Sequence, residues 1–122
     1  MLAIDKMSRV PIYEQIINGI EKEILSGLLK PLDQLPSVRE LALTLSANPN
    51  TVQKAFTELD RKGVTVSLPG KGSFVSANAP DILKLNLRAR LSEIETFVHQ
   101  LYSGGVSKEE ILEAVNKGLN HY

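Results

Sequence analysis

Hydrophobic side chains recur at helical spacing in three segments of the first half of the chain. The first stripe predicts an amphipathic helix that starts at Pro11, since proline suits a first helical position, and that ends at Gly27. The other two stripes are shorter and follow Ser37 and Asn48. The three stripes consist of Ile12, Tyr13, Ile16, Ile17, Ile20, Ile24 and Leu25; Val38, Leu41, Ala42 and Leu45; and Val52, Ala55, Phe56 and Leu59.

The starts of the second and third helices carry local signals. Ser37 and Glu40 form an S-x-x-E capping box, in which each side chain satisfies a free backbone N–H of the other's turn. Asn48 and Pro49 mark the start of the third helix, with an Asx cap followed by a proline at the first helical position. Only residues 45–47 separate the two patterns, so the helices must cross sharply, as in a helix-turn-helix.

A β-hairpin is expected directly after the third helix. Residues 64–68 alternate and are rich in β-branched side chains, residues 69–72 form a turn with a basic tip, and residues 73–76 return as a second strand. Leu35 is expected to add one strand residue. The predicted fold class is α+β, mainly α: a winged helix-turn-helix domain over residues 1–76, with its core in residues 11–76.

The remaining chain predicts a short linker, residues 77–80, and a helical segment, residues 81–122. One apolar seam steps by four and three residues, as in a coiled coil, and a last helix starts at the capping box of Ser107 and Glu110. Two such short helices cannot bury their apolar faces alone, so we expect a homodimer. The expected dimerisation residues are Leu87, Leu91, Ile94, Phe97, Val98, Leu101, Ile111, Leu112 and Val115.

Composition narrows the class of protein. The chain is 43% hydrophobic and 23% charged, which is typical of a soluble globular protein, and it has no cysteine for disulfides or thiolate metal sites. No apolar run reaches the roughly 20 residues of a membrane span, and no signal peptide is visible, so a cytoplasmic location is expected. Net charge is zero, so any affinity for phosphate must come from local placement of cations.

With these residues placed, the chain resembles the winged-helix domain of the GntR family of bacterial transcription regulators over roughly residues 9–76, and its short tail is similar to the YtrA-like branch. That resemblance implies a DNA-binding regulator without a large effector domain, and control of neighbouring transport genes. The matching residues are Gly27, Leu28, Pro31, Asp33, Leu35, Pro36, Ser37, Arg39, Leu41, Ala42, Thr51, Val52, Ala55, Leu59, Gly63, Gly70, Lys71, Gly72, Ser73, Phe74 and Val75, whereas many members have a glycine where Leu32 stands.

The resemblance implies that Arg39, the start of the third helix and the wing tip touch DNA. Asparagine and glutamine bond bidentately to adenine, and threonine methyls suit thymine. Many family members have arginine where Pro49 and Gln53 stand, so amides carry much of the expected base recognition here. The predicted DNA-binding residues are Ser37, Arg39, Asn48, Asn50, Thr51, Gln53, Lys54, Gly70, Lys71 and Gly72.

Plainer interpretations stay open for several of these side chains. Arg39 could pair with Glu40 or Asp33, Asn50 could serve only the helix start, and Lys71 could be a solvated turn residue. His99 and His121 lack the spacing of a metal site, and no nucleophile or phosphate-loop motif points to an enzyme or a cofactor.

The function that the sequence predicts is a homodimeric repressor that binds double-stranded DNA at a pseudo-palindromic operator. The sequence leaves open whether a small-molecule effector binds, for example between subunits. The alternative, favoured by the zero net charge, is a winged helix used as a protein-interaction module.

Overall fold

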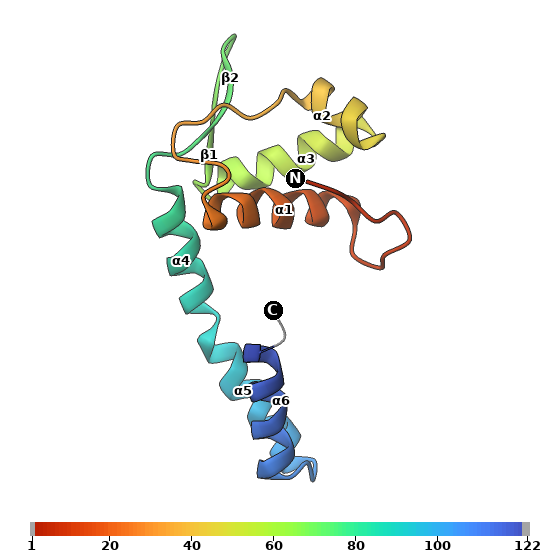
Figure 1. The fold of residues 1–122 in the computed structure, drawn as a ribbon, viewed down its shortest axis with the longest axis vertical. Helices are drawn as coiled ribbons and strands as arrows, with labels where there is room; N and C mark the ends of the chain where they lie inside the picture. The colour runs from red at the N-terminus through yellow and green to blue at the C-terminus, as the bar shows by residue number, and fades with distance from the viewer. Residues whose placement is uncertain (1, 121–122) are drawn as a thin grey trace. The chain divides into compact units, whose positions relative to one another are not determined.

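The computed structural model describes residues 2–120, which fold into two compact units, one ending at Leu85 and the other beginning at Asn86 (Figure 1). The elements are α1 (Ile12–Ser26), α2 (Val38–Leu45), α3 (Pro49–Arg61), β1 (Thr65–Leu68), β2 (Gly72–Val75), α4 (Ala79–Ala89), α5 (Leu91–Ser103) and α6 (Lys108–Asn120). Three helices followed by a hairpin confirm the predicted winged helix-turn-helix. None of the described helices, of which α1 is the longest, has the length and apolarity needed to span a bilayer.

The core of the first unit forms where the three predicted stripes meet. Ile16, Val52 and Leu59 are fully buried, and α1 packs beneath α3 (Figure 1). The helix begins one residue later than expected, with Pro11 as its N-cap, and it ends as expected at Gly27 in the left-handed conformation, with φ of 85°. This core holds α3 in a fixed position on α1.

The predicted caps of the helix-turn-helix are present. The Ser37 hydroxyl accepts a hydrogen bond from the Glu40 N–H at 3.0 Å, and the Glu40 carboxylate accepts one from the Ser37 N–H at 3.4 Å. The Asn48 side chain accepts from the Asn50 N–H at 2.8 Å. Between the two helices, Ser46 takes up the left-handed conformation with φ of 52°. The C-cap of α2 at Ser46 and the N-cap of α3 at Asn48 therefore fix both ends of the turn that sets α3 against α2.

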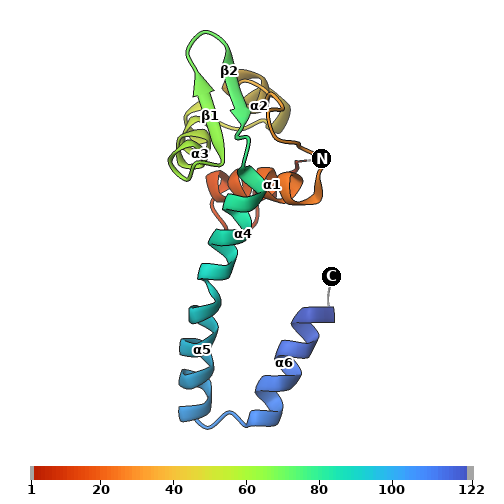
Figure 2. The same ribbon diagram turned by 90° about the vertical axis from the view of Figure 1, so that its left-hand side faces the viewer.

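The wing is a two-stranded antiparallel hairpin in which Thr65 pairs with Val75 and Leu68 pairs with Gly72. Figure 2 shows it rising beside α3, away from α1. Each strand differs by one residue from the predicted bounds. The extra strand residue is Gln34, which bridges Phe74, rather than the expected Leu35. The segment before α2 is thereby attached to the wing.

Residues 2–10, where the sequence shows no periodicity, form an arm on the helix-turn-helix. Leu2 lies over Gly19 so closely that a Cβ added to Gly19 would fall 1.9 Å from the Leu2 Cδ1. The Lys6 Nζ donates to the Ser46 carbonyl oxygen at 2.7 Å, and the Gln15 side chain exchanges hydrogen bonds with the Asp5 backbone. The arm therefore joins α1 to the turn between α2 and α3.

The C-terminal part differs from expectation in two places. The structure has a helix where a linker was expected, since α4 begins at Ala79, and Ala79 and Leu83 are buried in the core of the first unit. The seam from Leu87 to Leu101 was expected to be one helix, but it is divided between α4 and α5 by Arg90. The predicted capping box at the start of α6 is present, with both of its hydrogen bonds at 3.1 Å.

Candidate nucleic-acid interface

The outward face of α3 carries amides at its N-terminal end. Asn50 and Gln53 are exposed, and the Asn50 side chain makes no hydrogen bond to any described residue. The Gln53 amide donates to the Thr57 hydroxyl at 3.3 Å, which is a long bond, and the Asn48 oxygen is taken up by its cap. Thr51 is half-buried at the edge of this face. The amides of Asn50 and Gln53 are thus the groups best placed to reach an external partner.

Arg39 is exposed on the first turn of α2 and has no ion pair or hydrogen bond within residues 2–120. Both of its suggested partners are engaged elsewhere. Asp33 accepts from the Lys30 N–H at 2.8 Å, and Glu40 completes the capping box. The guanidinium fork is therefore available for a planar acceptor such as guanine or a phosphate.

A groove of about 420 Å³ brings the start of α2 and the wing tip together. Within it, Gln34 bridges the two walls, because its side-chain amide donates to the Lys71 carbonyl oxygen at 3.0 Å. Gly70, Lys71 and Gly72 are all exposed, with Gly70 and Gly72 at positive φ. The groove is lined by Gln34, Leu35, Pro36, Ser37, Glu40, Lys71 and Gly72. The predicted contacts Ser37 and Lys71 thus lie on one surface.

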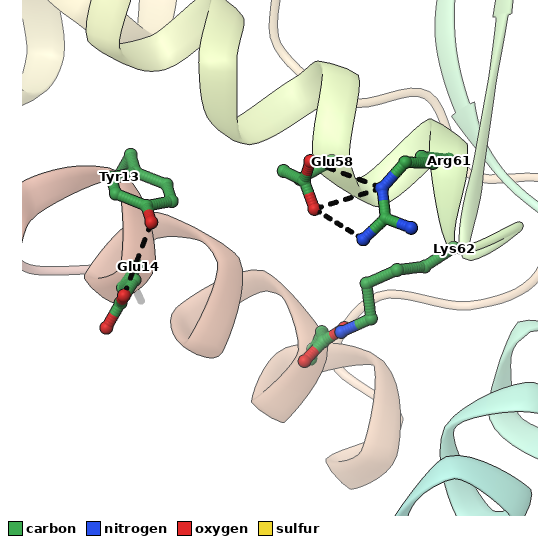
Figure 3. A network of polar contacts seen from close by, with 6 residues as sticks. Tyr13, Glu14, Glu58, Arg61 and Lys62 are labelled. Atoms are coloured by element: carbon green, nitrogen blue, oxygen red, sulfur yellow. Dashed lines mark hydrogen bonds and ion pairs between the residues drawn. The ribbon is translucent and has the colours of Figure 1, made fainter.

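Lys54 has a partner that the sequence did not suggest. Its Nζ lies 3.8 Å from the centroid of the Tyr13 ring, which reaches it from the start of α1. The Tyr13 hydroxyl donates to the Glu14 carboxylate at 3.3 Å (Figure 3). The charge of Glu14 raises the pKa of the Tyr13 phenol, so the ring stays neutral beside the lysine at physiological pH.

Two further cations at the end of α3 are tied to carboxylates (Figure 3). The Arg61 Nη2 lies 2.8 Å from a Glu58 oxygen, and this hydrogen bond lowers the pKa of Glu58. Lys62 pairs with Glu21 of α1. Sequence analysis did not single out Arg61, although its spacing of three from Glu58 is a recognisable helical pair. Paired cations are less available to phosphate than Arg39.

The second unit carries an apolar groove of about 710 Å³ lined by α5, α6 and the end of α4. Ile111 is buried between the helices, whereas Val98 and Leu101 are half-buried. The other expected dimerisation residues are between 44% and 62% exposed. They are Leu87, Leu91, Ile94, Phe97, Leu112 and Val115. Most of this face therefore has no partner within residues 2–120.

Within the described residues, no group of three or more His, Asp or Glu side chains is arranged to hold a metal ion. His99 is described, whereas His121 lies outside residues 2–120.

Known proteins are similar to this chain in both sequence and fold. Residues 12–75 match the model of the family described as bacterial regulatory proteins, gntR family. The chain is 41% identical to the HTH-type transcriptional repressor YtrA of Bacillus subtilis over 118 residues, which covers 96% of this chain and 91% of that protein. A crystal structure of a transcriptional regulator from Oenococcus oeni superposes with a TM-score of 0.71 at 36% identity, covering 98% of this chain and all of the other.

A second similar structure contains DNA. It is AraR(DBD) in complex with operator ORX1, with a TM-score of 0.55 and 28% identity over 62% of this chain and 93% of that one. The family model covers more than half of the chain, and the match to YtrA extends over nearly all of it. The chain therefore belongs to the GntR family of bacterial regulatory proteins and is a DNA-binding transcription regulator.

Proposed function

We propose that this regulator is a homodimeric repressor that reads a pseudo-palindromic operator. In each protomer, α3 would enter the major groove, α2 would cross the backbone, and the wing would lie along the adjacent strand. Two such domains meet half-sites about 34 Å apart, one helical turn of DNA. The observation that carries the proposal is the set of exposed polar side chains on α3, α2 and the wing, among which Asn50 and Arg39 make no side-chain hydrogen bond or ion pair within residues 2–120. YtrA, which is named a repressor, supports the direction of regulation.

Base recognition is assigned to the amides at the start of α3. Asn50 and Gln53 each carry a donor and an acceptor that match adenine N7 and N6, and each such pair discriminates against a wrong base by about 1–3 kcal/mol. Thr51 presents a methyl group for thymine. We therefore expect an operator whose important positions are A·T pairs.

Phosphate binding is assigned to Arg39 and Lys71, with the hydroxyl of Ser37 and the wing-tip backbone beside them. Because the whole chain has no surplus of positive charge, these few contacts supply the electrostatic affinity. Asp33 and Glu40 each accept a hydrogen bond from a backbone N–H and form no ion pair with Arg39. A second copy doubles the number of contacts, so dimerisation and DNA binding support each other.

Selection of bound duplexes from random DNA by the full chain tests the reading surface. We expect one A·T-rich, two-fold-symmetric sequence. On that duplex, Arg39→Ala should weaken binding at least tenfold and lower the salt slope by about 1 per protomer, whereas Gln53→Ala should relax specificity at one position. Lys22→Ala, at an exposed site on α1, is the matched charge control. If both test variants bound the selected duplex like the control, α3 would not be the reading helix.

Dimerisation is assigned to the apolar face of the second unit. Ile94 is 54% exposed and lines the groove, so a glutamate there would have to be buried at the interface. We expect Ile94→Glu to be monomeric in light-scattering chromatography at micromolar concentration and to lose operator binding. Glu95→Ala, at the neighbouring exposed site, should stay dimeric. An Ile94→Glu protein that remained dimeric would move the interface elsewhere.

The targets of regulation are a further part of the proposal. Resemblance to the YtrA-like branch makes neighbouring transport genes the first candidates. Deletion of the coding sequence should raise their transcripts if the protein is a repressor, and lower them if it is an activator.

A further inference from the structure

The contact between Lys54 and Tyr13 joins α3, which carries the proposed base-reading residues, to α1, which carries none of them. Tyr13 comes from the first turn of α1, whereas Lys54 stands on the outer side of α3. The ammonium lies 3.8 Å from the centre of the ring, well within the range of a cation–π interaction. The Lys54 ammonium makes no hydrogen bond or salt bridge to any described residue. The ring is thus the partner that fixes the position of this lysine.

We propose that Tyr13 is a positioning residue that holds the Lys54 ammonium in place to bind a phosphate of the DNA backbone. The inference rests on the proposed function, because it requires α3 to dock on DNA. A lysine ammonium has three N–H donors, and a ring on one side leaves the opposite side open. Lys54 can therefore stay on the ring while it binds a phosphate oxygen.

Holding Lys54 matters because its side chain is long and exposed. A free lysine loses up to about 2 kcal/mol of rotamer entropy when it is fixed in a complex. The ring restricts those rotamers before DNA arrives, so less ordering remains to be done on binding. Net charge is zero in this chain, so the placement of each cation has more weight than in a basic protein.

The role belongs to the ring rather than to the hydroxyl. The Tyr13 hydroxyl already donates to Glu14 at 3.3 Å. Two carboxylates face this region, Glu14 from α1 and Glu58 from α3; the hydrogen bond from Arg61 and, more weakly, the charge of Lys54 lower the pKa of Glu58. Glu58 is itself held by Arg61 through two nitrogens. Both carboxylates are thus engaged, and the ammonium is not paired with either of them.

The test is a double-mutant cycle on operator binding. The probe is a labelled 30-base-pair duplex that carries the sequence selected by the full chain, titrated at several salt concentrations. Lys54→Ala should weaken binding and reduce the salt slope by about 0.9 per protomer. Tyr13→Leu should weaken binding about two- to fivefold, the range of an exposed cation–π contact, whereas Tyr13→Phe keeps the ring and should bind like wild type.

The decisive variant combines both changes. In the Lys54→Ala background, Tyr13→Leu should have no further effect on affinity, because the lysine that it positions is gone. An equal loss in both backgrounds, or wild-type or tighter binding by Tyr13→Leu, would overturn the proposal. So would a Lys54→Ala protein with unchanged affinity and salt slope. The proposed function fails separately, if no sequence is selected or if Arg39→Ala and Gln53→Ala both bind like wild type. Thermal unfolding of each variant confirms that it is folded.

Discussion

Replacing Ser37 by alanine removes the acceptor that satisfies the Glu40 N–H in the first turn of α2. The hydroxyl accepts that bond at 3.0 Å, whereas the reciprocal bond from the Ser37 N–H to the Glu40 carboxylate is long, at 3.4 Å. The second bond survives the substitution but cannot replace the first. Because α2 has only eight residues, the loss of one cap affects a large part of the helix.

The expected loss of stability follows from the typical effect of replacing a helix N-cap residue. Substituting a serine N-cap by alanine costs about 1 kcal/mol of stability. Unfolding entropy is about 2.1 cal/mol/K per residue, so for a unit that ends at Leu85 this loss lowers Tm by about 6 °C. Ser37→Asp keeps an acceptor at the cap and should keep the wild-type Tm. It also places a carboxylate in the groove beside Lys71, so it should weaken DNA binding while leaving the fold intact.

Thermal unfolding and hydrogen exchange of the α2 amides together measure this effect. Ser107→Ala is the matched control, because it removes the same capping bond from α6 in the other unit. Ser37→Ala should speed exchange in α2 and leave α6 unchanged, and the control should do the reverse. The reasoning would be refuted by a Tm within about 1 °C of wild type, or by unchanged exchange in α2, since either would mean that the cap contributes little.

Two further predictions concern the wing and α3. Gly72→Ala should lower the free energy of unfolding by about 1 kcal/mol or more, because φ there is +115° and a Cβ would lie 2.8 Å from the Gln34 Nε2; urea unfolding measures this, with Gly27→Ala, also at positive φ but with nothing within 4 Å of its Cβ, as the control for backbone strain alone. Glu58 should contribute stability above its unfolded pKa of 4.5 and lose it as pH falls through its lower folded pKa, because the hydrogen bond from Arg61 stabilises the carboxylate. Glu58→Gln should therefore flatten the decline of stability in acid, and an unchanged acid profile would contradict that assignment.

The helix-turn-helix was predictable because its signals are local. A capping box spans four residues, and an Asx cap with a following proline spans two, so both are readable before any tertiary structure is known. Ser37 and Asn48 marked the starts of α2 and α3 in this way, and the structure confirms both. The wing followed from alternation and a glycine-rich turn, with an error of one residue at its ends.

The contacts that sequence analysis missed join residues far apart in the chain. Lys54 meets Tyr13, and Lys6 meets Ser46, through single side chains that leave no periodic trace. The break at Arg90 was hidden for a different reason. The apolar seam continues through it, and neither proline nor glycine marks the position.

The arm over Gly19 has a consequence for how this sequence can vary. Glycine inside a helix costs about 1 kcal/mol relative to alanine, so α1 would gain helix propensity from almost any replacement. A Cβ there would displace Leu2, whose Cδ1 lies 1.9 Å from the position that the Cβ would occupy. Positions 2 and 19 should therefore coevolve. Related sequences with an apolar residue at position 2 should have glycine at position 19, and those without the arm should more often have alanine there.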